Sequence, residues 1–177
     1  FFFDLIKEVI NMQVQQNLQE IAKVVVASDP SMANIVTINS RYGEIQVNLE
    51  NALFFPKGLL GLPDFKDFAL VDFPNPKFGQ FKLLQSLNDS QLSFVVLPVD
   101  PAKTKLIEKV DIDECCAITE IKAANLAMLL IVTVANTPSG VKLTANMRAP
   151  LAIDSNDKLA IQYVFPNSKY EIRFALN

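Results

Sequence analysis

Apolar residues recur at three- and four-residue steps through residues 5–25, with polar residues between them. This spacing gathers the apolar side chains on one face and is typical of an amphipathic helix. The Ser-Asp-Pro-Ser sequence at residues 28–31 then interrupts the pattern. We therefore expect residues 1–31 to form an amphipathic helix and linker, either a docking helix or a leader. Residues 32–177 are expected to form the main domain.

From residue 35 onward the pattern changes to period two. Alternation runs through residues 35–40 and again through residues 44–49, on either side of Tyr42-Gly43. Two alternating runs around a tight turn predict a β-hairpin. Further short apolar runs, bounded by turn-forming residues, predict strands at residues 68–73, 81–84, 93–97, 126–134, 143–147, 151–153, 160–164 and 170–174.

One segment breaks the series of strands. Residues 112–121 predict a short helix, with Asp111 as its N-cap and Glu114 three residues further on. The regular spacing of the strands suits a small, strongly twisted barrel or sandwich. The predicted fold class is therefore mainly β: a small antiparallel β-barrel-like domain with one short helix, preceded by the N-terminal amphipathic helix.

Composition narrows the classes of partner. Hydrophobic residues make up 50% of the chain and charged residues 20%, which is typical of a globular protein. The net charge of −3 argues against direct nucleic-acid binding, which needs a basic face, and fits a basic protein partner better. No apolar run reaches the roughly 18 residues of a membrane span, so no membrane contact is predicted.

The residues needed for most catalytic sites are missing from the sequence. The chain has no histidine, which excludes histidine-based acid–base catalysis and triads. Its two cysteines, Cys115 and Cys116, are adjacent, so they do not form a C-x-x-C site, and they favour a reducing, cytoplasmic location. We predict no cofactor and no metal. Asp111, Asp113 and Glu114 form either a solvated acidic face or a docking surface for a basic partner.

The segment 53–62, LFFPKGLLGL, is too apolar for an ordinary loop and too interrupted for a regular element. Pro56 fixes the chain, and Gly58 and Gly61 permit turns that branched residues resist. Its leucines are predicted either to fold inward as a lid over the core or to remain outside as a patch that receives a partner.

Several motifs, in order along the chain, resemble the FliW family of flagellar assembly factors. The resemblance is carried by Tyr42-Gly43-Glu44-Ile45, residues 55–62 (FPKGLLGL), residues 68–70, Leu84-Gln85-Ser86, residues 92–96, residues 130–134, Thr144-Ala145-Asn146, Ala149-Pro150-Leu151, and Tyr170 with Arg173.

The resemblance implies a small antiparallel β-barrel-like domain without enzymatic activity. It implies a regulator of flagellar assembly with two protein partners, flagellin and the RNA-binding translational repressor CsrA. Proteins of this family bind flagellin and, when it is exported, sequester CsrA and relieve repression of flagellin synthesis. The partner-binding residues that we expect on this basis and from the residues above are Phe55, Pro56, Gly58, Leu59, Leu60, Gln85, Ser86, Asp111, Asp113, Glu114 and Asn146.

Two other functions stay open at this point. The first is an export or assembly chaperone-like interaction module that uses the same fold for another helical partner. The second is an enzyme or small-ligand barrel with a pair of carboxylates, since residues that meet only in space cannot be paired from sequence.

Overall fold

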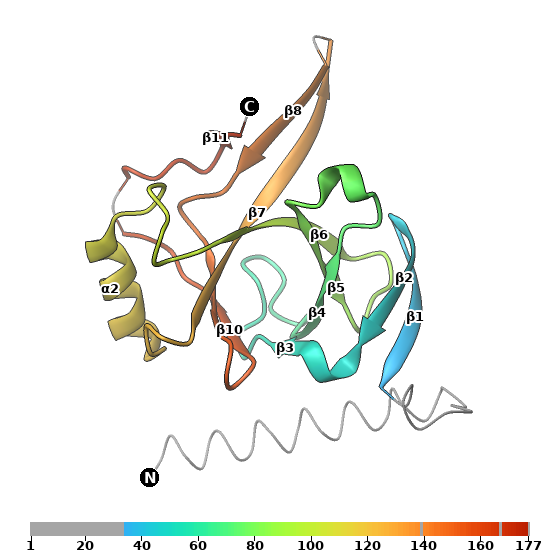
Figure 1. Ribbon diagram of the computed structural model, residues 1–177, viewed down its shortest axis with the longest axis horizontal. Helices are drawn as coiled ribbons and strands as arrows, with labels where there is room; N and C mark the ends of the chain where they lie inside the picture. Colours follow the sequence, from blue (N-terminus) through green and yellow to red (C-terminus); the bar gives the residue numbers. More distant parts are fainter. Residues whose placement is uncertain (1–33, 139, 167, 177) are drawn as a thin grey trace.

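The computed structural model describes residues 34–176, apart from residues 139 and 167. The predicted N-terminal amphipathic helix and the domain boundary at residue 31 lie outside the described residues, so both stay predictions. The described part is mainly β and contains one α-helix, as the sequence predicts (Figure 1).

The described residues contain eleven strands; ten follow the predicted order along the chain, and the short strand β3 was not predicted. They are β1 (Ile35–Ser40), β2 (Gly43–Asn48), β3 (Ala52–Phe54), β4 (Asp67–Asp72), β5 (Lys82–Ser86), β6 (Ser93–Val99), β7 (Leu126–Thr137), β8 (Gly140–Ala145), β9 (Leu151–Asp154), β10 (Leu159–Gln162) and β11 (Phe174–Ala175). The helix α2 spans Lys109–Thr119, and two 3-10 turns, η2 (Leu49–Asn51) and η3 (Pro76–Phe78), lie between strands.

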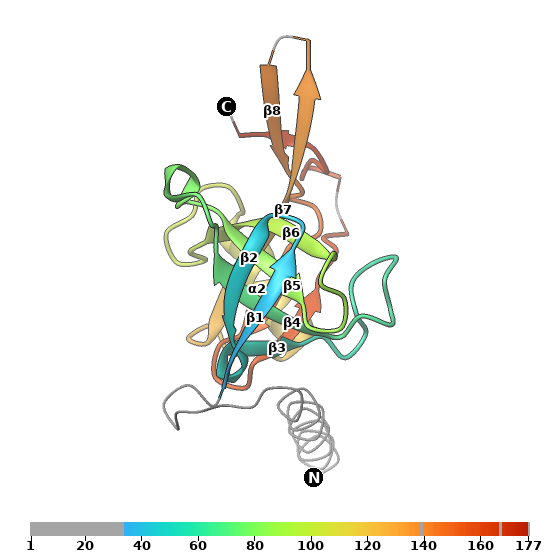
Figure 2. The same cartoon turned by 90° about the vertical axis from the view of Figure 1, so that its right-hand side faces the viewer.

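Nine of these strands form one sheet that closes on itself as a ring. Its order is β11-β8-β7-β6-β5-β4-β3-β10-β9, and β9 also pairs with β7. The pairings are antiparallel except for β3 with β10, which is parallel and joins Phe54 to Leu159. Strand β7 closes the ring because it pairs with β9 through its first residues and with β6 through its middle. Its last residues pair with β8 and form a hairpin that projects from the body (Figures 1 and 2).

The predicted hairpin of residues 35–49 is confirmed as β1 and β2. Its register pairs Val36 with Val47 and Ile38 with Ile45. Val36, Ile45 and Val47 are buried against Ala69 of β4, so the hairpin covers one side of the ring. The alternation of apolar and polar residues in this segment therefore reflects a hairpin with one buried face and one solvated face.

Two hydrophobic clusters lie on opposite faces of the ring. The inner cluster draws at least one buried residue from each of the seven strands that close the ring: Leu53, Phe68, Leu84, Val96, Leu129, Leu151, Ile153 and Ala160. The outer cluster uses the intervening residues, such as Leu83 and Val95, and is covered by α2 and by the segment that contains Tyr163, Phe165 and Tyr170. Because both faces of β5, β6 and residues 126–132 of β7 are largely buried, their sequences read as nearly continuous apolar runs.

The structure corrects three details of the predicted elements. The helix begins at Lys109, earlier than predicted, and Asp111 lies in its first turn instead of capping it. Strand β6 continues through Pro98, which is exposed and pairs with Leu129, whereas the proline was predicted to end the strand. Residues 170–174 do not form a full strand, because only Phe174–Ala175 pairs with β8.

Candidate functional site

The loop between β3 and β4 lies across the opening of the ring (Figure 1). Gly58 has a φ of +64° and Gly61 has a φ of +82°, so both need a conformation that side chains disfavour. Between them the loop folds back on itself, and Leu59 and Leu62 exchange backbone hydrogen bonds of 3.3 and 2.8 Å. A Cβ on Gly58 would come within 2.7 Å of the Cα of Pro63. The FPKGLLGL sequence therefore encodes one tight, specific turn.

Both predicted positions of the leucines, folded inward and exposed to solvent, occur in this loop. Leu59 is buried and belongs to the inner cluster, and Leu62 is partly buried against the same cluster. Leu60 lies on the outside with 63% of its surface exposed. The loop is thus a lid over the core that holds one large apolar side chain in solvent.

The residues before the turn anchor this lid. Phe55 is fully buried and packs edge-on against Phe68, with ring centroids 5.3 Å apart. The backbone N–H of Phe55 donates to the carbonyl of Lys66, which closes the base of the loop. Pro56 is partly exposed beside it. A direct partner contact of Phe55 or Leu59 stays a prediction; in this structure both side chains serve the core.

The lid is joined to the Asn146 segment by a series of hydrogen bonds. The Leu60 N–H donates to Oε1 of Gln162 over 2.9 Å, and Nε2 of Gln162 donates to the Ala149 carbonyl over 3.3 Å. Oδ1 of Asn146 accepts from the Ala149 N–H over 3.1 Å, and it also accepts from the Arg148 N–H. The structure therefore brings two of the predicted partner-binding segments together, although 86 positions (146 − 60) separate Leu60 from Asn146 in the sequence.

Gln85 and Ser86, by contrast, are buried. Nε2 of Gln85 lies 2.9 to 3.3 Å from the carbonyl oxygens of Ser86, Asp89, Ser90 and Leu92, and Oε1 of Gln85 accepts from the Ser93 hydroxyl. The Ser86 hydroxyl accepts from the N–H groups of Asn88 and Asp89. These side chains hold the turn between β5 and β6, so any contact of theirs with a partner stays a prediction.

The predicted acidic cluster divides between the interior and the surface. Asp111 is buried, whereas Asp113 and Glu114 are exposed. Lys109 pairs with Asp113 one turn along the helix, with 2.7 Å between Nζ and Oδ1. The solvent face of α2 therefore combines Asp113 and Glu114 with the exposed apolar side chains of Val110 and Ile118.

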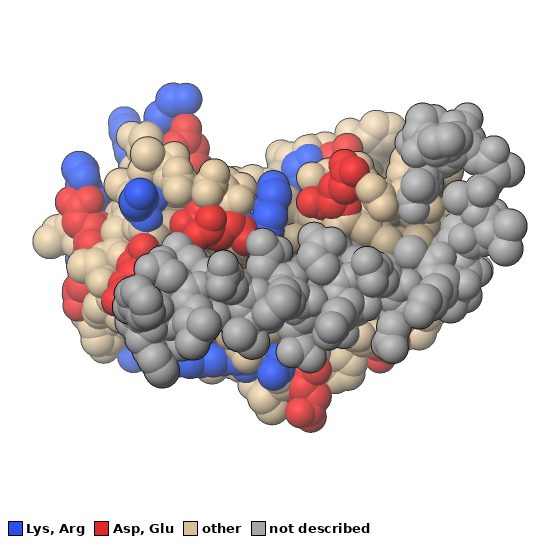
Figure 3. All heavy atoms as spheres, turned by 90° about the horizontal axis from the view of Figure 1, so that it is seen from below, with Lys and Arg blue, Asp and Glu red and all other residues tan. Residues whose placement is uncertain are grey.

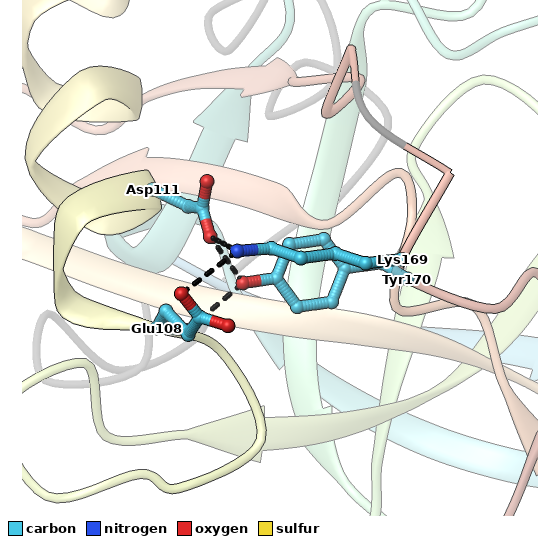
Figure 4. A network of polar contacts seen from close by, with 4 residues as sticks. All are labelled: Glu108, Asp111, Lys169 and Tyr170. Atoms are coloured by element: carbon cyan, nitrogen blue, oxygen red, sulfur yellow. Dashed lines mark hydrogen bonds and ion pairs between the residues drawn. The ribbon is translucent and has the colours of Figure 1, made fainter.

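Asp111 lies in a polar network that ties α2 to the C-terminal segment (Figure 4). Its Oδ2 accepts from the Tyr170 hydroxyl over 2.5 Å and lies 2.7 Å from Nζ of Lys169. Lys169 also pairs with Glu108, and the Glu108 N–H donates to the Tyr170 oxygen. Hydrogen bonds to Asp111 and Glu108 raise the pKa of Lys169 well above its usual range. Burial, followed by the bond to Asp111, raises the pKa of Tyr170.

The cysteines of α2 do not have the properties of a nucleophile. Cys115 is fully buried, and burial, with the neighbouring Cys116, raises its pKa to about 12. Burial is also the main cause that raises the pKa of Cys116. Both thiols therefore keep their protons at neutral pH, whereas a reactive cysteine needs its thiolate.

Acidic and basic side chains are interspersed on the face seen from below (Figure 3). Among the residues that the structure describes, no group of Cys, Asp and Glu side chains is arranged to hold a metal ion. Within the same part of the chain, no helix combines the length and the apolar character that a membrane crossing requires.

An aromatic cluster at one end of the hairpin β1–β2 was not predicted from the sequence. The rings of Tyr42 and Phe73 lie 5.6 Å apart, and those of Phe73 and Phe78 lie 5.8 Å apart. The three residues come from different segments, so no spacing rule joins them. The available signal was the pair of phenylalanines that flanks Pro74-Asn75-Pro76, since a proline-rich turn brings its two ends close together.

Comparison with known proteins agrees with this architecture. The family model described as FliW protein matches residues 34–176. The flagellar assembly factor FliW of Thermotoga maritima is 36% identical over 143 residues, which cover 78% of this chain and 91% of that protein. Its counterpart in Syntrophus aciditrophicus is 31% identical over 147 residues, which cover 76% of this chain and 83% of that protein.

A solved structure gives the same result. The crystal structure of a flagellar assembly factor FliW superposes with a TM-score of 0.63 and 26% identity, and the match covers 80% of this chain and 97% of that one. The chain therefore belongs to the FliW family of flagellar assembly factors.

Proposed function

We propose that the protein is a non-enzymatic, cytoplasmic regulator of flagellar assembly that binds flagellin and antagonises CsrA through protein–protein contacts, without a cofactor. Family membership over residues 34–176 is the observation that carries this proposal. The raised pKa values of both α2 thiols agree with a protein that binds and does not catalyse.

Leu60 is the residue that we assign to an apolar, helical segment of flagellin. Its side chain is 63% exposed, while its backbone is held by the bond to Gln162 and by the turn at Gly58 and Gly61. Val164, two residues beyond Gln162, is also exposed. An apolar side chain on a backbone that is already fixed loses less conformational entropy on binding, which favours affinity.

The outer face of α2 is the surface that we assign to CsrA. A repressor that binds RNA carries basic residues, and Asp113 and Glu114 are exposed carboxylates on this face. Charge complementarity of this kind increases the association rate and the selectivity of a protein–protein contact. The neighbouring Val110 and Ile118 supply the apolar contacts that carbon-rich stems of lysine and arginine can cover.

Calorimetry with flagellin and with CsrA from the same genome tests the proposal. We expect saturable binding to each, and we expect Leu60→Ser to weaken flagellin binding about tenfold or more. Val141→Ser, which removes an equally exposed apolar residue from the projecting hairpin, is the matched control and should bind normally. Absence of heat with both partners at about 100 μM protein, a concentration at which a Kd of about 10 μM would leave most of the protein bound, would contradict the proposal and favour a chaperone-like module for another helical partner.

Antagonism needs a separate measurement. CsrA is bound to its flagellin-mRNA site, and the chain is added while the fraction of bound RNA is followed by gel shift. The unmodified chain should release the RNA, whereas the double variant Asp113→Lys with Glu114→Lys should fail to do so. Glu171→Lys, an exposed acidic residue outside α2, is the control and should retain activity. Equal release by all three proteins would exclude α2 as the contact.

A further inference from the structure

The aromatic cluster is built from three separate segments of the chain. Tyr42 belongs to the turn between β1 and β2, Phe73 follows β4, and Phe78 ends η3. The ring of Phe73 lies between the other two, at centroid distances of 5.6 Å to Tyr42 and 5.8 Å to Phe78. Tyr42 and Phe73 are partly buried against the outer cluster, so the row of rings extends from the core to the surface.

Phe78 forms the exposed end of this row. It is 46% exposed, and every residue from 74 to 80 in its loop is exposed. The loop has a defined shape, since Asn75 accepts from the N–H groups of Lys77 and Phe78, and Pro76 occupies the first turn of η3. Exposed phenylalanine in a pre-organised turn resembles an anchor of a protein interface more than a core residue.

Two cations, Arg41 and Lys77, accompany the rings. The Arg41 guanidinium lies 5.3 Å from the centroid of the Tyr42 ring, and Lys77 precedes Phe78 in the exposed loop. Lys82 is paired with Asp72 at 2.5 Å, so its charge is balanced within the protein. Arg41 and Lys77 are thus positive charges beside these aromatic side chains. On α2, by contrast, carboxylates lie beside the exposed apolar residues.

We propose that Arg41, Tyr42, Phe73, Lys77 and Phe78, here called the aromatic–basic patch, form a docking site for a partner polypeptide that carries carboxylates beside large apolar side chains. The apolar side chains would pack on Phe78 and Phe73, and the carboxylates would pair with Arg41 and Lys77. This site is additional to the Leu60 loop and to α2, and its existence does not depend on the flagellin and CsrA contacts.

A polypeptide fits the patch better than single-stranded RNA. The rings meet one another at interplanar angles of 57° and 71°, so they cover one another's faces and form no open stack for bases. Two cations beside the rings, on a chain of net charge −3, are also few for a phosphate backbone.

Fluorescence anisotropy with defined peptides tests this inference. The probe is a labelled 18-residue helical peptide with leucine and phenylalanine on one face and glutamate on the other. Its counterpart carries lysine in place of glutamate. We expect the acidic peptide to bind the full chain, and we expect Phe78→Ser and Arg41→Glu each to weaken its binding about tenfold. Ile118→Ser, which removes an exposed apolar residue of α2, should leave its affinity unchanged.

Other outcomes overturn the inference. Absence of binding of the acidic peptide, or equal binding by the Phe78→Ser protein, would show that the patch is not the site. Loss of binding in Ile118→Ser would assign the peptide to α2. Binding of a labelled 12-nucleotide single-stranded RNA that Phe78→Ser abolishes would assign the patch to nucleic acid. Far-UV circular dichroism of each variant checks that the fold is intact, which is expected because Arg41, Phe78 and Ile118 are exposed.

Discussion

The Tyr170 hydroxyl donates a 2.5 Å hydrogen bond to the Asp111 carboxylate across 59 residues of sequence. Asp111 lies in the first turn of α2, and Tyr170 lies in the segment that leads to β11. The same hydroxyl accepts from the Glu108 N–H, one of the amides that a helix N-terminus leaves without an intrahelical partner. One phenol therefore fixes both the start of α2 and the path of the C-terminal segment.

Tyr170→Phe should destabilise the protein by about 1–3 kcal/mol, because it leaves a buried carboxylate and a helix N–H each without one hydrogen bond. Urea unfolding followed by circular dichroism measures this change. Tyr42→Phe, which also removes one tyrosine hydroxyl and keeps its ring beside Phe73, is the control and should change stability by less than about 0.5 kcal/mol. A stability loss confined to Tyr42→Phe would contradict the role given to Tyr170.

Stability should fall in alkali because of Cys115. Its folded-state pKa is raised from 9.0 to about 12 by burial and by Cys116. Between these two pKa values the buried thiol keeps its proton, whereas the thiol of the unfolded chain loses it. The stabilisation that comes from burying the neutral thiol is therefore complete below pH 9 and is lost between about pH 9 and pH 12. In this range the free energy of unfolding falls by at most about 1.4 kcal/mol per pH unit.

Urea unfolding at several values between pH 8 and pH 11, under reducing conditions, measures this slope. Cys115→Ala should flatten it, since the group that loses its proton on unfolding is gone. Cys116→Ala, which removes a partly exposed thiol, should keep most of it. The same slope in Cys115→Ala and in the unmodified chain would show that other groups, such as Tyr163 and Tyr170 with their raised pKa values, cause the effect.

Local patterns predicted the strands well where one face of a strand is solvated. The hairpin of residues 35–49 alternates cleanly, and its predicted boundaries agree with β1 and β2 to within one residue at each end. The start of α2 was placed too late because Asp111 looks like an N-cap in sequence. The structure instead directs its carboxylate to Tyr170 and Lys169, and no local rule reveals partners that are about 60 residues away.

The candidate site was only partly predictable for the same reason. The glycines of the lid, with their positive φ angles, follow from the FPKGLLGL sequence. The division between buried Leu59 and exposed Leu60 depends on the ring beneath them, and the joining of the lid to Asn146 depends on Gln162. Gln85 was expected to contact a partner, whereas its side chain is buried and its amide lies within 3.3 Å of four backbone carbonyl oxygens.

Gln85→Leu should cost about 1–3 kcal/mol, because the change keeps the volume of the side chain but removes the amide that the Ser86 and Ser90 carbonyls accept from. The Asp89 and Leu92 carbonyls keep the backbone N–H groups of Leu92 and Ser86 as donors. A side-chain amide has two N–H groups, so Nε2 shares them among the four carbonyl oxygens within 3.3 Å. Hydrogen exchange should show faster opening of residues 86–92 than of β7. Ser93→Ala removes one hydrogen bond to Oε1 and should cost only about 1 kcal/mol. Equal costs for the two variants would contradict this account.

Gly58→Ala and Gly61→Ala form a matched pair within the same loop. Both residues have positive φ, which costs a non-glycine residue about 1–3 kcal/mol. At Gly61 the added methyl group meets open space, so that cost stands alone. At Gly58 the methyl group would meet the backbone of Leu62 and Pro63, with the Cα of Pro63 only 2.7 Å away. Backbone atoms cannot relieve such a clash by changing rotamer, as a side chain can. We therefore expect Gly58→Ala to lower the melting temperature clearly more than Gly61→Ala, and the reverse order in a thermal melt would show that the turn does not have this geometry.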